Sequence, residues 1–253
     1  MRSSRPSPDL EPRRTLYGRR KGRPLRSRQR ELIAALLPKL ELALPEPGQN
    51  GAIDCLELGK IFPRPGTEHT TEIGLEIGFG SGEHLLAQAL RRPDVGFIGC
   101  EPYENGVAKL LASIDSVRAT GTPVENIRIC REDGQALLAA LPDQCLRRVF
   151  LLFPDPWPKM RHHKRRFITP DTVGEMARVL SDGAELRVAT DHPGYCRWAL
   201  SHVTGTPAFL WQADGPNDWR QRPSDRPETR YEAKARAAGR ACYYLSFRRL
   251  PRS

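Results

Sequence analysis

The sequence predicts a doubly wound α/β fold, in which helices cover both faces of a mostly parallel sheet. Short apolar runs alternate with helical segments from residue 73 to residue 203. A glycine-rich turn follows the first apolar run, and an acidic residue stands at the end of each of the first five runs. Ligands of such sheets bind beyond the carboxyl ends of the strands, so these acids predict a binding site at one edge.

The chain is expected to consist of a flexible basic arm, residues 1–28, and one domain, residues 29–253. Residues 1–30 contain eleven Lys or Arg and two acids, so most of the net charge of +10 lies at this end. A segment rich in Arg, Pro and Ser stays unfolded until it meets a polyanion. Composition alone leaves open a nucleic-acid-binding arm, a solubilising tail or an organelle transit peptide.

The elements of the domain follow from hydrophobic periodicity. Residues 29–44 carry leucines at helical spacing and are interrupted by Pro38, which predicts a short helix, a break and a second turn. A connector rich in Pro and Gly spans residues 45–71. The predicted strands are residues 73–77, 95–100, 126–130, 149–153, 184–189, 208–212 and 241–247. The predicted helices among them are residues 83–91, 105–118, 135–140, 170–180 and 195–203, with a break at 181–183 and a polar loop at 227–232.

The glycine-rich turn contains Gly78, Gly80 and Gly82 and leads into a helix. Glycines let the backbone approach a ligand closely, and the free N–H groups of a helix N-terminus can bind it. The spacing departs from the dinucleotide-binding pattern, because residue 83 is Glu where that pattern has Gly. Glu76, two residues before the first glycine, would repel a pyrophosphate and attract a cation. The turn therefore indicates S-adenosylmethionine, whose amino and sulfonium groups are positively charged.

Two further acids follow the second and third predicted strands. Glu101 is placed to accept hydrogen bonds from both hydroxyls of a ribose. Asp133 accepts from an adenine amino group, caps the helix that follows, or does both.

The stretch from Arg147 to Phe167 combines a buried strand, an acid, an aromatic residue and a cationic loop. Asp155 lies between two prolines directly after the apolar run, and Trp157 follows it. The loop then carries Lys159, Arg161, His162, His163, Lys164, Arg165 and Arg166. Such an arrangement is typical of a site that handles a flat, polar ring attached to a polyanion.

The composition argues against several other classes of protein. No run of about 18 apolar residues exists, so no membrane span is predicted. The amino terminus lacks the apolar core of a secretory signal. The six cysteines form no Cys-x-x-Cys pair and are expected to be reduced thiols of a cytoplasmic protein. The six histidines show no metal-ligand spacing, so no metal is expected.

Two motifs carry a resemblance to a known family. Residues 153–159 (Phe-Pro-Asp-Pro-Trp-Pro-Lys), with the basic loop after them, and residues 229–232 (Thr-Arg-Tyr-Glu) resemble the bacterial tRNA (guanine-N7)-methyltransferases. These enzymes are class I methyltransferases that use S-adenosylmethionine. The resemblance implies a Rossmann-like, seven-stranded and mostly parallel sheet with an antiparallel last strand. It also implies a tRNA partner, 7-methylguanosine in the tRNA variable loop as product, and a cytoplasmic bacterial monomer or homodimer.

The same resemblance implies roles for individual residues. The cofactor site would be formed by Glu76, Glu101, Asp133 and Asp155, with Asp155 as the catalytic residue. RNA or guanine contacts would come from Lys159, Asp191, Thr229, Arg230, Tyr231 and Glu232. The cations between Lys159 and Arg166, together with the arm, would bind phosphates.

The chemistry of the implied reaction is consistent with these residues. Guanine N7 has an in-plane lone pair and no proton, so it attacks a sulfonium methyl group without a general base. The enzyme then contributes mainly orientation. A carboxylate at Asp155 would stabilise the positive charge that moves onto the purine and accept from guanine N–H groups. Trp157 and Tyr231 are candidate stacking partners for the ring.

Three alternative functions remain at the level of sequence. A methyltransferase acting on an exocyclic amine would carry an acid-Pro-Pro-aromatic loop, whereas this loop is Asp-Pro-Trp-Pro. A tRNA-binding protein that has the methyltransferase fold but no turnover would not need the acids and glycines present here. A dehydrogenase is disfavoured by the glycine spacing.

Overall fold

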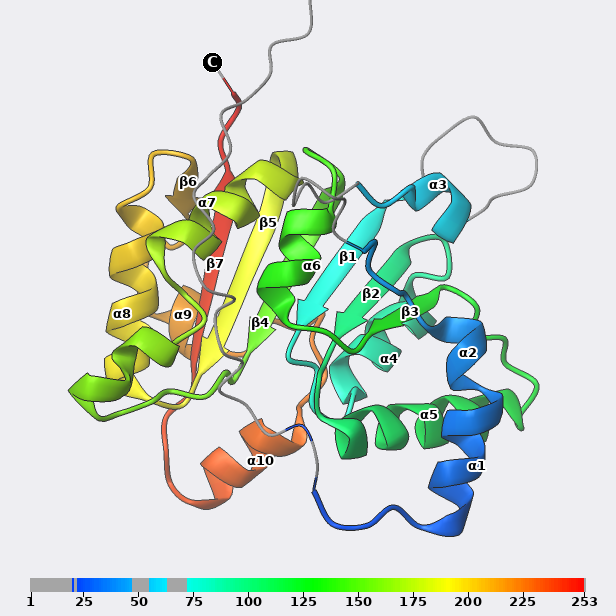
Figure 1. The fold of residues 1–253 in the computed structure, drawn as a ribbon. Coiled ribbons are helices and arrows are strands. Elements are labelled where there is room, and N and C mark those ends of the chain that lie inside the picture. The colour runs from blue at the N-terminus through cyan, green and yellow to red at the C-terminus, as the bar shows by residue number, and fades with distance from the viewer. Residues whose placement is uncertain (1–19, 21, 47–54, 63–71, 253) are drawn as a thin grey trace, which may run out of the picture.

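The computed structural model of the chain describes residues 20, 22–46, 55–62 and 72–252. Its centre is a seven-stranded sheet with the strand order β3-β2-β1-β4-β5-β7-β6 (Figure 1). The strands are β1 (Ile73–Ile77), β2 (Gly96–Cys100), β3 (Ile127–Cys130), β4 (Leu146–Leu152), β5 (Leu180–Thr190), β6 (Phe209–Trp211) and β7 (Tyr243–Arg249). Strands β1 to β5 pair in parallel, and β7 runs antiparallel to both β5 and β6. The predicted mostly parallel α/β sheet with an antiparallel last strand is therefore confirmed.

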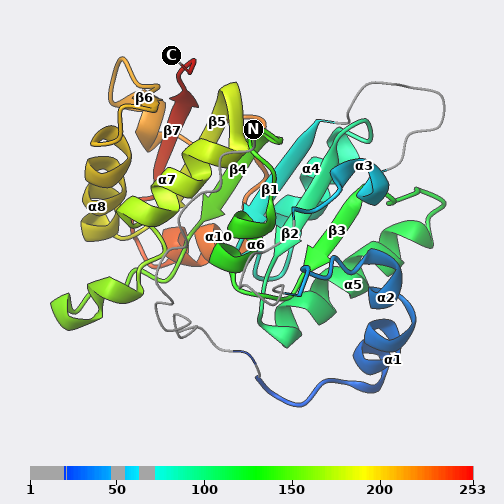
Figure 2. The same cartoon turned by 45° about the horizontal axis from the view of Figure 1, so that its top comes forward.

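Helices cover both faces of the sheet. They are α1 (Ser27–Ala35), α2 (Leu37–Leu40), α3 (Leu58–Ile61), α4 (Glu83–Arg91), α5 (Glu104–Arg118), α6 (Gly134–Ala140), α7 (Pro170–Val179), α8 (Pro193–Thr204), α9 (Asn217–Arg220) and α10 (Arg230–Ala237), with a 3₁₀ helix η1 (Met160–Arg165). Buried side chains of α1, α2, α4 and α5 form one apolar cluster, and those of α6, α7 and α8 form another. Figures 1 and 2 both show α1 and α2 beside α5 at one edge of the sheet, and α8 with β6 at the other edge.

The local sequence explains most of these elements. Every residue of β1 and of β2 is buried, as expected for strands covered on both faces. The predicted break at Pro38 is confirmed, since α1 ends at Ala35 and Pro38 occupies the first turn of α2. Cys100 and Cys130 are buried where β2 pairs with β3, and neither forms a disulfide. Among the described helices none has the length and apolar character to cross a membrane.

Two sequence predictions about local structure are wrong. Residues 181–183 are predicted as a break after the helix at 170–180. They belong to β5 instead, where they form an irregularity between the pairs Leu146–Leu180 and Arg148–Glu185. Gly183, with φ +76°, supplies the left-handed backbone that this bulge requires. Residues 229–232, predicted as a loop, begin α10 instead, because the side chain of Thr229 accepts a hydrogen bond from the Glu232 amide and caps the helix.

The part of the basic arm that the structure describes lies against α5. The amide of Glu104 donates to the Arg20 carbonyl at 3.0 Å, and Asn105 Nδ2 donates to the Arg23 carbonyl at 2.7 Å. Arg28 in α1 pairs with Asp115 of α5 at 2.6 Å. Residues 1–19 and 21 of the predicted arm lie outside the described residues.

The carboxyl ends of the parallel strands all point to one edge of the sheet. In Figure 1 this edge faces downward, toward α10, while the end of the chain lies at the opposite edge. A ligand site is therefore expected near α10 rather than near the chain end.

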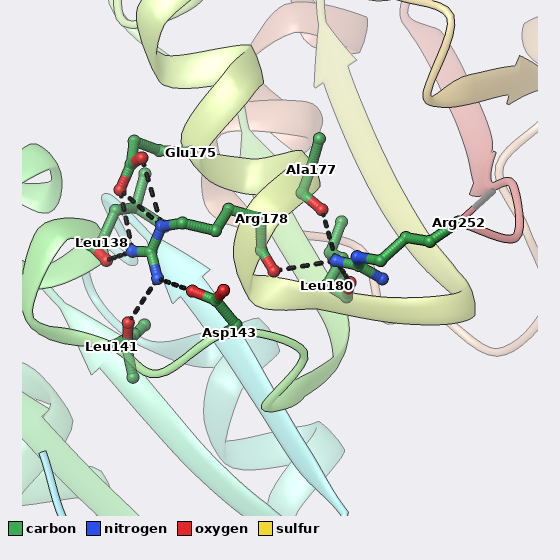
Figure 3. A network of polar contacts seen from close by, with 8 residues as sticks. All are labelled: Leu138, Leu141, Asp143, Glu175, Ala177, Arg178, Leu180 and Arg252. Carbon is green, nitrogen blue, oxygen red and sulfur yellow. Dashed lines mark hydrogen bonds and ion pairs between the residues drawn. The ribbon is translucent and has the colours of Figure 1, made fainter. Parts of the chain in front are cut away.

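Two arginines bind backbone carbonyls at the end of the sheet that lies away from α10 (Figure 3). Arg178 in α7 donates to the carbonyls of Leu138 and Leu141 at 2.7 and 2.8 Å, and so caps α6, which ends just before Leu141. Asp143 and Glu175 balance its charge at 2.7 and 2.8 Å. Arg252 donates in the same way to the carbonyls of Ala177, Arg178 and Leu180, each at 2.9 Å, and pairs with Asp182 in the bulge.

The substitution Arg178→Met should lower the free energy of unfolding by about 2–3 kcal/mol, because it leaves two backbone carbonyls without their charged donor. Urea denaturation followed by circular dichroism measures this change. Arg147→Met is the matched control, since Arg147 is half exposed, donates to Ser181 and the Asp182 carbonyl at 3.3 and 3.2 Å, and lies 3.9 Å from Glu72, which is also half exposed. It should change stability by no more than about 0.5 kcal/mol. Equal effects of the two substitutions would contradict this role of Arg178.

Candidate functional site

A cavity of about 620 Å³ lies at the carboxyl edge of the sheet, between the ends of β1, β2 and β4 and the start of α10. Its lining includes Gly78 and Gly80 of the glycine turn, the acids Glu101, Asp133 and Asp155, and the aromatic residues Trp157 and Tyr231. Three cations of the basic loop, Lys164, Arg165 and Arg166, also line it. The structure therefore brings together parts of the glycine turn, the Asp155 loop, the basic loop and the Thr-Arg-Tyr-Glu motif, while Glu76 and Asp191 lie outside the lining.

The glycine turn has the backbone that only glycine adopts easily. Gly78, Gly80 and Gly82 have φ of +73°, +60° and +79°. A Cβ at Gly82 would lie 2.6 Å from Leu110 Cδ1, so packing also leaves no room for a side chain at this position. No atom lies within 4 Å of a Cβ built at Gly78, where the turn faces the cavity. At this turn the backbone itself can contact a ligand in the cavity.

Gly106 in α5 brings this helix unusually close to the turn. A Cβ there would lie 2.3 Å from the Gly80 carbonyl oxygen, which is far inside van der Waals contact. Sequence reasoning missed this residue, because a single glycine inside a helical pattern gives no sign of what it packs against.

Glu101 binds the glycine turn and faces the cavity at the same time. Its Oε2 accepts from the Gly80 amide at 2.8 Å, and its Oε1 accepts from the Tyr103 amide at 3.0 Å. A carboxylate has about four lone pairs, so two remain for a ligand. Burial raises the pKa of Glu101 above its ordinary value, against the lowering effect of these two amides, and the nearby Asp155 raises it further.

Asp133 performs the structural role that the sequence left open. Its Oδ1 accepts from the Gln135 amide at 2.7 Å and caps α6. Because Asp133 also lines the cavity, its second oxygen remains available to a ligand there. The helix cap fixes the position of this oxygen.

Glu76 lies behind the cavity rather than in its lining. It is 3% exposed, and its Oε2 lies 2.7 Å from Nδ1 of His84, which is equally buried. Gln88 continues this contact through Nε2, 3.3 Å from the other ring nitrogen of His84. The pairing of Glu76 with His84 was not foreseen, although their spacing of eight residues across a strand-turn-helix unit permits it.

Asp155 sits in a loop with an unusual backbone on both sides. Phe153 and Trp157 have φ of +50° and +40°, which bulky residues rarely adopt. Within the described residues the Asp155 carboxylate forms no hydrogen bond or ion pair, and it is exposed to the cavity. Left-handed conformations of this kind persist only where surrounding contacts hold them.

Arg166 provides one of these contacts. Its Nε donates to the Pro156 carbonyl at 2.9 Å, and its guanidinium lies 4.8 Å from the Trp198 ring. At 4% exposure, Arg166 holds the loop from within, in contrast to the exposed Lys159, Arg161 and Lys164. The sequence could not separate it from the other cations of the same run.

Trp157 is contacted by the basic loop that follows it. The guanidinium of Arg165 lies 5.0 Å from its ring centroid, and His162 meets it edge-on at 5.8 Å. His163 instead packs edge-on against Trp198 at 5.4 Å. Loss of solvation and the neighbouring cations Arg165, Arg161 and Lys159 lower the pKa of His162 below its ordinary value.

The Thr-Arg-Tyr-Glu motif divides into outward and inward residues. Tyr231 lines the cavity and lies over Gly80, where a Cβ would be 3.2 Å from its ring. Arg230 is exposed and lies 4.0 Å from Glu83. Thr229 and Glu232 are buried, the former as the cap of α10 and the latter in an ion pair with Arg226.

Asp191 also lies apart from the cavity lining. Its carboxylate pairs with Arg240 at 2.7 Å, which ties the end of β5 to the segment after α10. The predicted guanine contact at Asp191 is therefore not part of the cavity that the structure shows.

Comparisons with known proteins agree on one family. A sequence model of a protein family described as "Putative methyltransferase" matches residues 70–245. A protein of Rhodospirillum rubrum named tRNA (guanine-N(7)-)-methyltransferase is 54% identical, over 94% of this chain and 88% of its own length. Proteins with the same name from Zymomonas mobilis and Nitrobacter hamburgensis are 46% and 48% identical, over 94% and 93% of this chain and 95% and 86% of their own lengths.

The substitution Gly78→Ala should weaken the binding of an S-adenosyl ligand at least tenfold, since its methyl group would extend into the cavity where the backbone meets the ligand. Titration calorimetry with S-adenosylhomocysteine measures the affinity. Gly121→Ala is the matched control, because Gly121 also has a left-handed φ, +85°, and no atom within 4 Å of its Cβ. Each substitution should cost about 1 kcal/mol of stability, but only Gly78→Ala should affect binding. Unchanged affinity of the Gly78→Ala variant would contradict this assignment of the turn.

Proposed function

The chain belongs to the tRNA (guanine-N(7)-)-methyltransferase family, and we propose that it transfers a methyl group from S-adenosylmethionine to N7 of a guanine in the variable loop of tRNA. The observation that carries the proposal is the single cavity in which the glycine turn and two acids face Asp155 and the basic loop. One half of this cavity suits an adenosine bearing a cationic group. The other half suits a base attached to a phosphate chain. The enzyme would act in the cytoplasm, where its tRNA substrate is found.

The chemistry of the cavity fits the methyl donor. The open turn at Gly78 leaves room for the ligand against the backbone, and Glu101 and Asp133 keep acceptor oxygens toward the cavity. S-adenosylmethionine, when bound, supplies a methyl group on a positively charged sulfur. Glu101 would accept from the ribose hydroxyls, and Asp133 from the adenine amino group. Glu76, which its contact with His84 holds in place outside the lining, would attract the cationic groups of the ligand by its negative charge.

Asp155 would act on the guanine by charge and orientation. Because N7 carries no proton, no residue has to remove one, and the exposed Asp155 carboxylate is free to accept from guanine N–H groups. The same carboxylate would stabilise the positive charge that develops on the purine. Tyr231 and Trp157, which both line the cavity, would hold the plane of the base.

The exposed cations would hold the phosphates of the tRNA. Lys159, Arg161 and Lys164 are exposed along η1 and its entry, next to the cavity that Lys164 lines. Arg230 is a further exposed cation, at the start of α10. Residues 1–19 would add further phosphate contacts from the arm. Binding should accordingly weaken as the salt concentration rises.

The purified protein, incubated with unmodified tRNA and labelled methyl donor, should produce 7-methylguanosine at one position of the variable loop. Mass spectrometry of the digested RNA identifies the base. Methyl transfer to an exocyclic amine, or tRNA binding without transfer, would contradict the proposal and support one of the two alternative functions.

Asp155→Asn keeps the shape of the side chain and removes its charge. It should lower kcat by about 100-fold or more while the dissociation constant for tRNA changes by less than about threefold, since charge stabilisation acts mainly in the transition state. Asp171→Asn, an exposed carboxylate in the first turn of α7, is the matched control and should behave as the wild type. A fully active Asp155→Asn enzyme would remove Asp155 from the mechanism.

The affinity for S-adenosylhomocysteine should depend on pH through Glu101. The ionised carboxylate is the form that accepts two hydroxyl protons, so affinity should be constant at high pH and fall as pH drops through the pKa of Glu101. Burial raises this pKa, so the loss should begin at a higher pH than for an exposed glutamate. Calorimetry across pH 4 to 8 measures the profile. Glu101→Gln should weaken binding and flatten the profile; a variant that keeps the wild-type pH dependence would rule out Glu101 as its source.

A further inference from the structure

A buried polar cluster around Glu232 lies next to Tyr231 in α10 and outside the lining of the cavity. Glu232, in the first turn of α10, is 1% exposed. Its Oε2 lies 2.8 Å from Arg226, and its Oε1 accepts from the Tyr244 hydroxyl at 2.6 Å and lies 3.2 Å from Arg222. Both oxygens are thus engaged inside the protein. The carboxylate is not available to a nucleotide.

Arg226 connects this cluster to the loop that carries Asp155. Its guanidinium lies 5.6 Å from the ring centroid of Phe153 and 4.7 Å from that of Tyr244. Its Nε, buried, has no hydrogen-bond partner among the described residues, as expected where a guanidinium stacks on ring faces. Phe153 is the residue whose left-handed backbone turns the chain out of β4 toward Asp155.

The segment that carries Arg226 is itself firmly held. The Asp225 carbonyl accepts from Gln88 and Arg91 of α4, at 3.0 and 2.5 Å. The Asp225 carboxylate accepts from Arg187 of β5 at 2.6 Å. Arg226 therefore projects from a backbone tied to both α4 and the sheet, and its guanidinium can fix other parts relative to these two.

The cluster is also adjacent to Tyr231 in the chain. Tyr231 precedes Glu232 in the first turn of α10 and lies over the glycine turn. Because Glu232 is fixed by Arg226 and by Tyr244 of β7, the helix cannot rotate or lift without breaking a buried ion pair. Removing one partner of such a pair is strongly unfavourable.

We propose that Arg226, paired with Glu232, is a positioning residue for methyl transfer, which sets the Asp155 loop and Tyr231 at the correct distance from each other. This inference rests on the proposed function. Arg226 touches neither the cofactor nor the base. It contacts the strained loop at Phe153 and the helix at Glu232, so that Asp155 and Tyr231, which lie beside these contacts and line the cavity, move as one unit.

The test compares Arg226→Met with Arg222→Met. Both arginines contact Glu232, but within the described residues only Arg226 stacks on Phe153. Arg226→Met should lower kcat by about 100-fold, as expected for a displacement of reacting groups by about 1 Å. The dissociation constants for S-adenosylhomocysteine and tRNA should change by less than about threefold. Arg222→Met should leave kcat within about threefold of the wild type. Concentrations of folded enzyme are set by the stoichiometry of S-adenosylhomocysteine binding.

Two further variants make the outcome unambiguous. Glu232→Gln should lower kcat with little change in tRNA affinity; an unchanged kcat with tRNA binding weakened tenfold would instead show a direct substrate contact and overturn the proposal. Arg226→Lys keeps a positive charge beside Glu232 and loses the stacking on Phe153, so it serves if Arg226→Met does not fold. It should lower kcat about tenfold through misplacement, and a wild-type kcat would overturn the proposal.

The wild-type enzyme separates this inference from the function on which it rests. If it forms no 7-methylguanosine, the proposed function fails and the positioning role fails with it. If the wild type is active and Arg226→Met has a normal kcat for each folded molecule, even at reduced stability, the ion pair is merely structural and only the positioning role is overturned.

Discussion

The position of β1 in the sheet is the constraint on which the site depends. β1 pairs with β2 on one side and β4 on the other, so the chain leaves β1 and β4 toward opposite faces at the same edge. Ile77 is paired both with Cys100 and with Leu151, so β1 and β2 end level and β4 ends one residue later. The glycine turn, Glu101 and the Asp155 loop therefore meet without any long connection. The other residues of the site set the distances between these three parts.

The parts of the site that follow a parallel strand could be predicted from the sequence. Glycines after β1 and acids after β2, β3 and β4 must lie at one edge, because parallel strands share a direction. Glu101, Asp133 and Asp155 accordingly line one cavity. The core elements could also be predicted from the sequence, since β1 and β2 are continuous buried runs and Pro38 marks a helix boundary.

The residues that hold these acids in place could not be found in the same way. Arg166 and Glu232 belong to charged stretches that look solvated in sequence, but each is buried by partners that only the fold supplies. Arg226 reaches Phe153 across more than seventy positions of the chain, and no local pattern encodes such a contact. The bulge in β5 was missed for a similar reason: Ser-Asp-Gly is a turn signal, and only pairing with β4 keeps it within a strand.

The contacts of Arg252 with backbone carbonyls and with Asp182 have a practical consequence. It binds the last described residues to the end of α7 and to Asp182, at the edge of the sheet opposite the cavity (Figures 1 and 3). A tether attached beyond Arg252 would pull on this edge and leave the cavity and the basic loop turned away from a support. Surface immobilisation through that end is thus the orientation in which a large, stiff polyanion can still approach the protein freely.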